Sequence, residues 1–481
     1  MQARTLPGIL LSFLSLGTWL APAAPCQAQS RAERPPAGSM ERVEATERLV
    51  GALKRLAKWC NQNELFRRRD AALRSILAFE PANAEARQLL RYRRERDGSW
   101  TQPRPYKEPR DIGSAKLPEL AKLGAEMLER VEGPVLGMLD REPSLDSDRS
   151  RRPYLDALLV LDPENDRLHA RLGEVRGPDG GAWILAESAS ALTRRSELAL
   201  LAPRILEALP APRPIEPEEF EKPLAGSWRT VLASEHLRIL ATDAADSAAE
   251  CIRLAEATLA LFDRGLKRES CEGLRFTIYL LAPEEKATFL ARHPAVGPER
   301  ASELSRFESF WVFDRSELVV CAKQPEFRID HVVRQTISRE LFDHFHLYPD
   351  SGVLHAGVMS YLASLVQSAR APSRADGARR ADRPRALAAP RELLAVEGML
   401  EKPASKLGRT EIEACRDLAG YLLEGWPART ADLLARTGSG SGLDPAMRAT
   451  LGFELSTVEE RYARWFQETR GEVDGPAIVT R

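Results

Sequence analysis

The sequence predicts an α+β protein in which a helical N-terminal region precedes a domain with a small sheet and a mainly helical C-terminal part. Three observations support this prediction. Residues 40–206 consist of successive segments with the helical spacing of apolar residues. Residues 207–227 interrupt that pattern with five prolines and, from Glu216 on, four glutamates, which predict a stiff linker between domains. Residues 228–470 begin with alternating strand-like and helix-like segments and end with helices.

The first 28 residues have the pattern of a secretory signal peptide. Arg4 supplies the positive charge, Ile9–Ala21 the apolar core, and Cys26-Gln27-Ala28 a cleavage site of small residues. The apolar run is too short to cross a bilayer comfortably. We therefore expect an exported protein, periplasmic or extracellular, with no stable membrane span after cleavage.

The overall composition excludes some classes of partner and of scaffold. The chain has 69 Lys and Arg against 70 Asp and Glu, so it has no basic bias, which argues against a nucleic-acid partner. Five cysteines remain after the signal and are too scattered for a disulfide scaffold or a zinc knuckle. Cys251 and Cys271 are the pair to test for a disulfide. Most of the cysteines are expected to act as small buried hydrophobic residues.

The N-terminal region contains an internal repeat. Its first copy, Ala78–Trp100, is AFEPANAEARQLLRYRRERDGSW, and its second, Val160–Trp183, is VLDPENDRLHARLGEVRGPDGGAW. Each copy places an acidic-Pro step, a helical segment, basic residues, a turn with Asp and Gly, and a Trp in the same order. The preceding residues, 56–81, are similar to a tetratricopeptide-like helix pair. Such pairs form arrays that present a groove to partners, and a compact helical cap is the alternative.

Short apolar runs predict the strands of the C-terminal domain. Residues 228–241 alternate apolar and polar side chains, and residues 274–282, LRFTIYLLA, have the composition of a buried strand. Between them, residues 245–266 have the spacing of a long amphipathic helix. Residues 310–313 and 317–321 predict a hairpin.

The following stretch, residues 334–365, predicts a helix, a short turn and a second apolar helix, and it holds the residues that bear on chemistry. After it, residues 369–390 are rich in Arg, Ala, Ser and Pro and predict a disordered basic loop. A solvated insertion and a docking patch for an acidic partner are its two interpretations. The remaining residues up to 470 are predicted to be helical.

This stretch resembles the core of gluzincin, zincin-type metallopeptidases. Their first helix carries His-Glu-x-x-His, and residues 339–343 here are Arg339, Glu340, Leu341, Phe342 and Asp343. The second helix of that family follows Trp-Leu-x-Glu-Gly-x-Ala-x-Tyr-Leu, which residues 353–362 match at Leu354, Gly357, Tyr361 and Leu362, with Ala356 at the third-ligand position. The resemblance extends from about Trp228 to Phe466 and implies a zincin-like domain with a small mixed sheet.

The residues that would hold zinc in such a domain are missing here. Catalytic zinc requires three protein ligands and an open position. Arg339 cannot ligate, Ala356 has no donor atom, and Asp343 offers at most one oxygen. We therefore expect no zinc cofactor, and Glu340, at the former general-base position, then has no metal-bound water to activate.

Three hypotheses concern the former metal position. Arg339 and Asp343 are four residues apart on one helix face, so the ion pair between them would stand where the metal was, with the guanidinium supplying the positive charge and Asp343 or Glu340 balancing it. The alternative is a solvated pair worth under about 1 kcal/mol. An atypical metal site formed by Glu340, His344 and either His355 or His331 is a third arrangement.

The sequence thus predicts an exported, catalytically inactive zinc-peptidase-like protein. Its expected role is to bind peptides or proteins through the former substrate cleft or the helical region. The alternatives are an active metal-dependent hydrolase with the atypical site, and a purely structural envelope protein.

Overall fold

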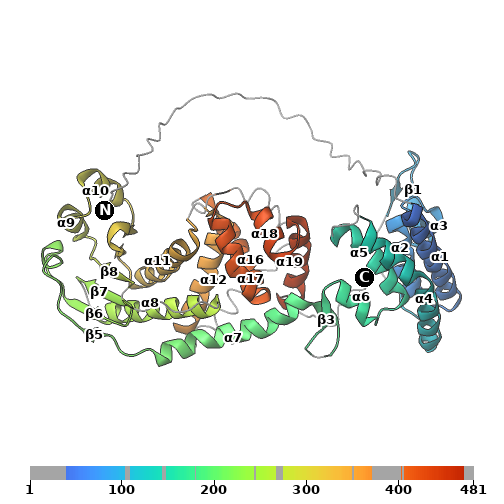
Figure 1. The fold of residues 1–481 in the computed structure, drawn as a ribbon, viewed down its shortest axis with the longest axis horizontal. Helices are drawn as coiled ribbons and strands as arrows, with labels where there is room; N and C mark the ends of the chain where they lie inside the picture. The colour runs from blue at the N-terminus through green and yellow to red at the C-terminus, as the bar shows by residue number, and fades with distance from the viewer. Residues whose placement is uncertain are drawn as a thin grey trace, which may run out of the picture.

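The computed structural model places N-terminal helices at one end of an elongated molecule, a β-sheet at the other end and the C-terminal helices between them (Figure 1). The predicted signal, 1–28, and residues 371–390 of the predicted basic loop lie outside the described residues. The structure describes residues 40–102, 109–142, 148–178, 180–242, 245–266, 273, 275–348, 351–370, 402 and 406–470.

The N-terminal region consists of two copies of one unit: a long helix, a 14-residue helix, a short helix and a two-stranded hairpin. The first copy contains α1 (Met40–Gln62), α2 (Phe66–Phe79), α3 (Ala84–Leu89), β1 (Arg93–Arg94) and β2 (Trp100–Thr101). The second copy contains α4 (Leu117–Arg141), α5 (Asp148–Leu161), α6 (Asp166–Arg171), β3 (Glu174–Arg176) and β4 (Trp183–Leu185). The repeat predicted from the sequence is therefore present, and it extends back to include a long helix in each copy.

The two copies are alike because the same residue types perform the same local tasks. Asn83 and Asn165 cap the short helices, each accepting a hydrogen bond from the backbone N–H three residues later. Arg91 and Gly173 then take positive φ angles of 62° and 68° at the turn into each hairpin. The hairpins distinguish this unit from a plain helix–turn–helix repeat, so the tetratricopeptide-like assignment is not confirmed.

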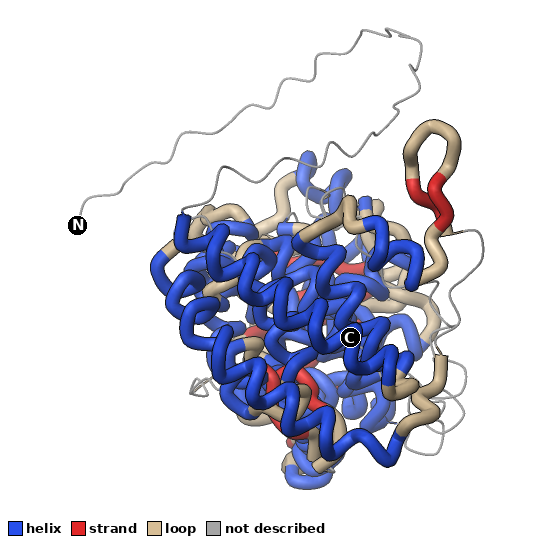
Figure 2. Tube along the Cα trace, turned by 90° about the vertical axis from the view of Figure 1, so that its right-hand side faces the viewer, coloured by secondary structure: helices blue, strands red, loops and turns tan. Residues whose placement is uncertain are grey.

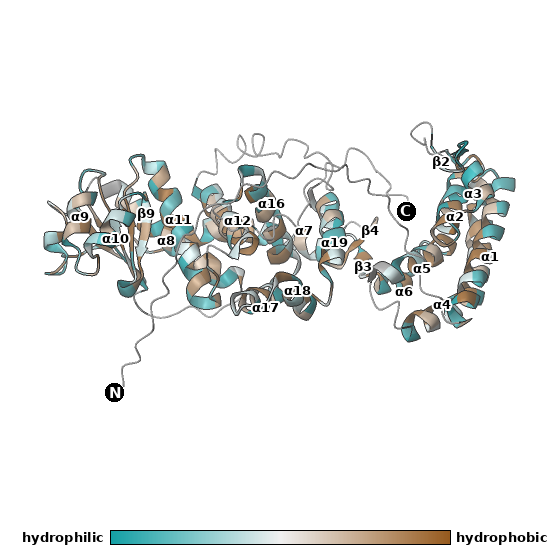
Figure 3. Ribbon diagram, turned by 90° about the horizontal axis from the view of Figure 1, so that it is seen from above, coloured by the Kyte–Doolittle hydropathy of each residue, from teal (hydrophilic) through white to brown (hydrophobic). Residues whose placement is uncertain are grey.

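The helices of both copies pack around one hydrophobic core. Its buried residues come from α1, α2, α3, α4, α5 and α6 and the short loops between them, from Ala45 to Leu168. Apolar surfaces of these helices face one another, as the colouring of Figure 3 indicates. This core is separate from the two cores of the C-terminal part.

The boundary between the cores lies before α7 (Ala186–Ala208), which corrects the predicted division at 207–227. α7 runs along the C-terminal helices (Figure 1), and its residues Ala191, Leu198 and Ile205 belong to their core. Nor is the Pro/Glu segment a free linker. Within it, β5 (Arg213–Pro214) pairs with the sheet edge and Leu224 is buried. An edge position suits Pro214, because it has no N–H to donate.

The C-terminal part contains a six-stranded mixed sheet with the order β5-β6-β7-β8-β10-β9. Strand β8 pairs in parallel with β7 and β10, and the other pairs are antiparallel. This confirms the small mixed sheet. The central strand β8 is buried throughout because its side chains alternate between the two cores on either face. The remaining strands are β6 (Thr230–Ala233), β7 (Leu237–Ala241), β8 (Phe276–Leu280), β9 (Ser309–Val312) and β10 (Glu317–Val320).

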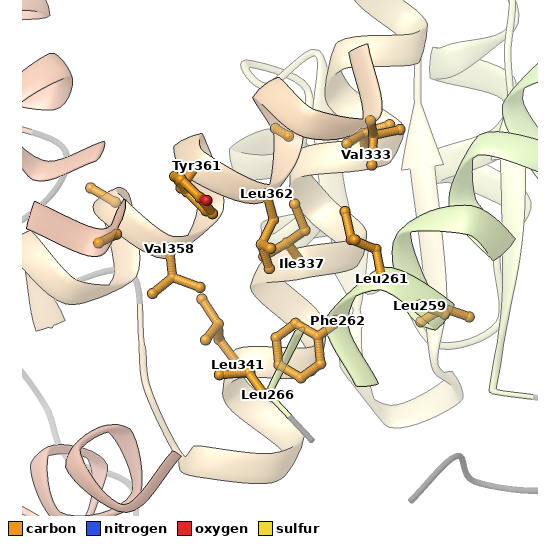
Figure 4. Close-up of a cluster of buried hydrophobic side chains, with 14 of the residues drawn as sticks. Leu259, Leu261, Phe262, Leu266, Val333, Ile337, Leu341, Val358, Tyr361 and Leu362 are labelled. Atoms are coloured by element: carbon orange, nitrogen blue, oxygen red, sulfur yellow. The ribbon is translucent and has the colours of Figure 1, made fainter. Parts of the chain in front are cut away.

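Helices cover both faces of this sheet. The larger core lies between the sheet, α8 and α11, and it continues through α12 to the C-terminal helices. In Figure 4, Phe262 of α8, Ile337 and Leu341 of α11 and Leu362 of α12 lie close together in this core. The helices are α8 (Ala245–Gly265), α9 (Lys286–Arg292), α10 (Pro298–Leu304), α11 (Pro325–Phe345), α12 (Val353–Arg370), α16 (Arg409–Gly420), α17 (Pro427–Gly438), α18 (Leu443–Leu451) and α19 (Leu455–Arg470), with a π-helical turn at Tyr421–Gly425.

Two further findings concern the described residues as a set. None of the helices in the described part of the chain combines the length and the apolar character needed to cross a membrane. The four cysteines of that part, Cys60, Cys251, Cys321 and Cys415, are buried and form no disulfide with one another, and burial raises their pKa to about 11 or 12. Cys271 lies outside the described residues.

Candidate functional site

The residues singled out by the sequence lie on α11 and α12. Helix α11 has Pro325 in its first turn and ends at Phe345, and the next residue, His346, takes a left-handed conformation with φ 54°. Gly352, with φ 61°, precedes α12. The predicted helix–turn–helix is therefore present, with a first helix that begins nine residues before Arg334.

Arg339 and Asp343 form the predicted ion pair, with 2.5 Å between Nε and Oδ2. The Arg339 side chain is 13 % exposed and that of Asp343 is 38 % exposed. The guanidinium lies 5.3 Å from the ring centroids of Trp311 and Phe313 and 5.9 Å from that of Phe342. The arginine is thus enclosed by aromatic rings while its carboxylate partner faces solvent. This differs from a fully solvated pair.

These contacts set the expected cost of removing the guanidinium. Arg339→Met should lower the free energy of unfolding by about 1–2 kcal/mol, because the ring contacts and one ion pair are lost while Asp343 stays solvated. The matched control is Arg409→Met, since Arg409 pairs with Glu413 at the same helical spacing and is 92 % exposed. It should change stability by under about 0.5 kcal/mol. Equal effects in urea unfolding would show that the rings contribute nothing.

Glu340, at the former general-base position, pairs with Arg275 and not with Arg339. Its Oε2 accepts a hydrogen bond from Arg275 Nη1 at 2.7 Å and lies 3.1 Å from His344 Nε2. Arg275 Nη2 also donates to Asp263 Oδ2 at 3.1 Å. The Glu340 and Asp263 side chains are almost completely buried. The hypothesis that Glu340 balances the charge of Arg339 is therefore wrong.

The residues of the hypothetical atypical metal site do not converge. Glu340 and His344 are in contact, but His355 Nε2 lies 3.0 Å from Ser338 Oγ, and His331 Nδ1 lies 2.9 Å from Ser309 Oγ. Within the described part of the chain, no group of three or more His, Cys, Asp or Glu side chains is arranged to hold a metal ion. Ala356, at the former third-ligand position, is buried and offers no donor.

His355 is 2 % exposed, and burial lowers its pKa to about 4. In the unfolded chain the pKa is about 6.5, so between these values the unfolded state binds a proton that the folded state does not. This contribution to stability is complete above about pH 6.5 and declines as the pH falls towards 4.

We expect the loss attributable to this histidine to reach about 2 kcal/mol at about pH 4.5. His355→Gln keeps a polar group near Ser338 but removes the titration. The variant should therefore lose less stability than the native protein between about pH 7 and pH 4.5. Urea unfolding at the two pH values measures the difference. If the native protein and His355→Gln lost the same free energy of unfolding, His355 would not be the source of the pH dependence.

Strand β9 forms the edge of the sheet beside α11. The Cys321 N–H donates to Glu308 O, and hydrogen-bonded pairs alternate along an antiparallel ladder. The backbone N–H and C=O groups of Ser309 and Trp311 therefore point away from β10, towards the unpaired side. The side chains of these two residues turn to α11, where Trp311 Nε1 donates to Gln335 and Ser309 Oγ contacts His331.

Four aromatic rings continue this edge across the end of α11. The centroid of Trp311 is 6.3 Å from that of Phe313, Phe313 is 5.5 Å from Phe342, and Phe342 is 5.0 Å from Tyr348. Phe313 is 47 % exposed and Tyr348 is 55 % exposed. We call Trp311, Phe313, Phe342 and Tyr348 the aromatic row. Because it encloses Arg339, this surface combines apolar area with one held cation.

A concavity of about 420 Å³ lies away from this surface, between the second N-terminal unit and the C-terminal helices. None of the residues predicted from the α11–α12 stretch lines it. Several of its arginines already have carboxylate partners, such as Arg461 with Glu187 and Arg171 with Asp140. The lining of this concavity is therefore typical of a polar contact between the two parts of the chain and not of a charged binding site.

The sequence identified Arg339, Glu340, Asp343 and Ala356 but missed the surface formed around them. The hairpin at 310–321 was predicted, yet its position at the sheet edge beside α11 depends on strand order. The aromatic residues of the pattern SFWVF, 309–313, were the available signal. Arg275, the partner of Glu340, was predicted only as part of the strand at 274–282, and no sequence pattern indicated that it pairs with Glu340.

Comparison with known proteins adds no relative to this picture: no family model matches the chain, and neither do any curated proteins or solved structures.

Proposed function

We propose that this chain is an exported, non-catalytic protein of gluzincin descent that binds an extended peptide or protein segment along β9 and the aromatic row. One observation carries the proposal: an edge strand with outward backbone groups lies directly beside an arginine enclosed by aromatic rings. The export part rests on the N-terminal sequence pattern, and the descent rests on the motifs of α11 and α12.

The backbone of β9 suits an added strand. Ser309 and Trp311 direct their N–H and C=O groups to the unpaired side of the sheet. An extended segment can continue the ladder there through main-chain hydrogen bonds, which supply affinity without demanding a particular sequence. Such addition also satisfies the exposed polar groups of an edge strand.

The side chains beside β9 would determine which segment binds. Phe313 and Tyr348 offer exposed aromatic area for apolar side chains. The enclosed guanidinium of Arg339, held in place by Asp343, puts a positive charge just beneath the aromatic row, which favours an acidic side chain or a terminal carboxylate there. The preferred ligand is therefore an extended segment with apolar residues and one carboxylate.

The chemistry of the former catalytic positions supports a role without catalysis. Arg339 and Ala356 cannot ligate a metal, and Glu340 is engaged with Arg275 in a buried ion pair. The side chain of Glu340 is therefore held by a buried cation and is not free to act as a general base. The atypical metalloenzyme is disfavoured for the same reason, since Arg275 occupies one side of Glu340.

A backbone substitution tests the proposed mode of binding. Peptides selected from a phage-displayed random dodecamer library would be measured by fluorescence anisotropy against the full-length protein. Ser309→Pro removes one outward N–H without touching the bonds to β10, and should weaken binding about tenfold, the worth of one hydrogen bond.

Ser309→Ala is the matched control, because it loses the same hydroxyl contacts with His331 and Gln335 but keeps the N–H. It should bind peptides nearly as well as the native protein. If the two variants bind equally, the segment does not add to β9. If no peptide is selected at all, the purely structural role is the better account.

A further inference from the structure

The hairpins β1–β2 and β3–β4 are equivalent parts of the two N-terminal units. In the first, the guanidinium of Arg87 lies 5.6 Å from the ring centroid of Trp100. In the second, His169 occupies the same place and stacks on Trp183 at 3.8 Å. Arg87 and His169 each also contact the carbonyl oxygen six residues earlier, at 2.7 and 2.9 Å. The two hairpins are therefore built in the same way.

The second hairpin docks a helix. Arg464 of α19 donates from Nη1 to Glu174 at 2.5 Å and from Nη2 to the carbonyl oxygen of Trp183 at 3.4 Å. One helical turn later, Glu468 accepts a hydrogen bond from the Leu185 N–H at 3.1 Å. Glu174 is buried in this contact. A single charged face of α19 thus holds both strands of the hairpin.

The first hairpin has no such helix on it among the described residues, and it stands out from the N-terminal helices (Figures 1 and 2). Four of its six residues from position 91 to 96 are exposed arginines whose side chains form no hydrogen bond or ion pair with another described residue. Its two acidic residues accept hydrogen bonds within the hairpin, Glu95 from the Thr101 hydroxyl and Asp97 from the Ser99 hydroxyl. The four arginines are Arg91, Arg93, Arg94 and Arg96.

We propose that the β1–β2 hairpin, residues 91–101, docks an acidic amphipathic helix of a partner protein, in the manner in which β3–β4 docks α19. The expected helix is acidic, where α19 contributes arginines, because the β1–β2 hairpin is basic, where the β3–β4 hairpin contributes a carboxylate. Where the second hairpin presents the carboxylate of Glu174 to Arg464 of α19, the first has Tyr92 at the equivalent position and a cluster of arginines around it.

This surface has the composition of a protein contact. Arginine and tryptophan are enriched among residues that dominate binding energy, and unpaired surface arginines steer an oppositely charged partner into place. The inference is independent of the function proposed for β9, because the hairpin lies at the opposite end of the molecule (Figure 1).

The α19 sequence itself supplies the probe. A labelled peptide of residues 455–470, cross-linked to hold a helix and carrying Arg461→Glu and Arg464→Glu, would be titrated with full-length protein at about 50 mM salt, where screening is weak. We expect it to bind at least about tenfold more tightly than the same peptide with the native arginines. Binding should weaken as salt is raised.

Two protein variants locate the contact. Arg93→Ser with Arg94→Ser should weaken binding at least about tenfold, since two charge-assisted contacts are lost. Arg55→Ser with Lys58→Ser removes the same charge from the exposed face of α1 in the same unit and should have no such effect. Both pairs are exposed, so both variants should fold.

Three results would overturn the proposal. One is no binding of the helical, charge-reversed peptide at about 1 mM, a concentration that detects even weak complexes. Another is the same loss of affinity in the control variant. The third is tighter binding of anionic lipid vesicles or duplex DNA than of the peptide through Arg93 and Arg94, which would assign the hairpin to that class of ligand.

Discussion

Replacing Arg275 by methionine should lower the free energy of unfolding by about 3–5 kcal/mol, because it leaves two buried carboxylates without their cation. Arg275 joins Glu340 of α11 at 2.7 Å to Asp263 of α8 at 3.1 Å. All three side chains are at most 10 % exposed. Methionine fills a similar volume, so the charge and not the packing is what changes. Urea unfolding at neutral pH measures the effect.

The matched control is Arg334→Met on the same helix. Arg334 pairs with Asp330 at 2.8 Å, but both side chains are about one-third exposed. Its loss should cost under about 1 kcal/mol. If Arg275→Met were as mild as Arg334→Met, Glu340 would not depend on Arg275, and the interpretation of its engaged carboxylate would fail.

Substituting Gly357 by alanine should cost about 3 kcal/mol or more, because α12 and α16 are in backbone contact at this glycine. A Cβ built at Gly357 would lie 2.3 Å from the carbonyl oxygen of Cys415 and 2.9 Å from its carbon. A backbone carbonyl cannot rotate away, so the two helices must separate. Gly357 is also one of the positions that match the gluzincin pattern.

The same substitution at Gly51 in α1 should have the opposite sign. Apart from its chain neighbours and the backbone of its own helix, no atom lies within 4 Å of a Cβ built there. Gly51→Ala should therefore stabilise the protein by about 0.5–1 kcal/mol, through helix propensity alone. Thermal unfolding of the two variants would distinguish a steric effect from a general response to alanine. A mild Gly357→Ala variant would mean that α12 and α16 are not so closely packed.

The elements that the sequence predicted well are those whose signals are local. The internal repeat was visible because an acidic-Pro step, a turn with Asp and Gly and a Trp recur in the same order in both copies, and each of these serves the local geometry of the unit. The helix pair at 334–365 was predicted from apolar spacing for the same reason. The pairing of Arg339 with Asp343 followed from their separation by four residues on one helix.

What the sequence could not supply depends on tertiary contacts. The apolar residues of α7 indicate a buried face but not which core receives it, so the helix was assigned to the N-terminal region. The Pro/Glu segment is mostly exposed, as expected, but its composition did not indicate that β5 pairs with the edge of the sheet. Glu340 was expected near Arg339, but α8 and β8 bring Asp263 and Arg275 against it.

The two proposed surfaces give the molecule a coherent division of roles. The sheet end offers an edge strand and the aromatic row to an extended segment, and the N-terminal end offers a basic hairpin to a helix. The C-terminal helices lie between these ends (Figure 1). A protein arranged in this way can hold two partners at once, since neither surface overlaps the other.

The most direct test of the central claim, that this is a zincin-like domain without its metal, is the zinc content of the native protein purified without chelator or affinity tag. Mass spectrometry of the metal should find zinc well below one atom per chain, because positions 339, 343 and 356 supply at most one ligand. Zinc near one atom per chain would contradict the account and would point to a site built from other donors.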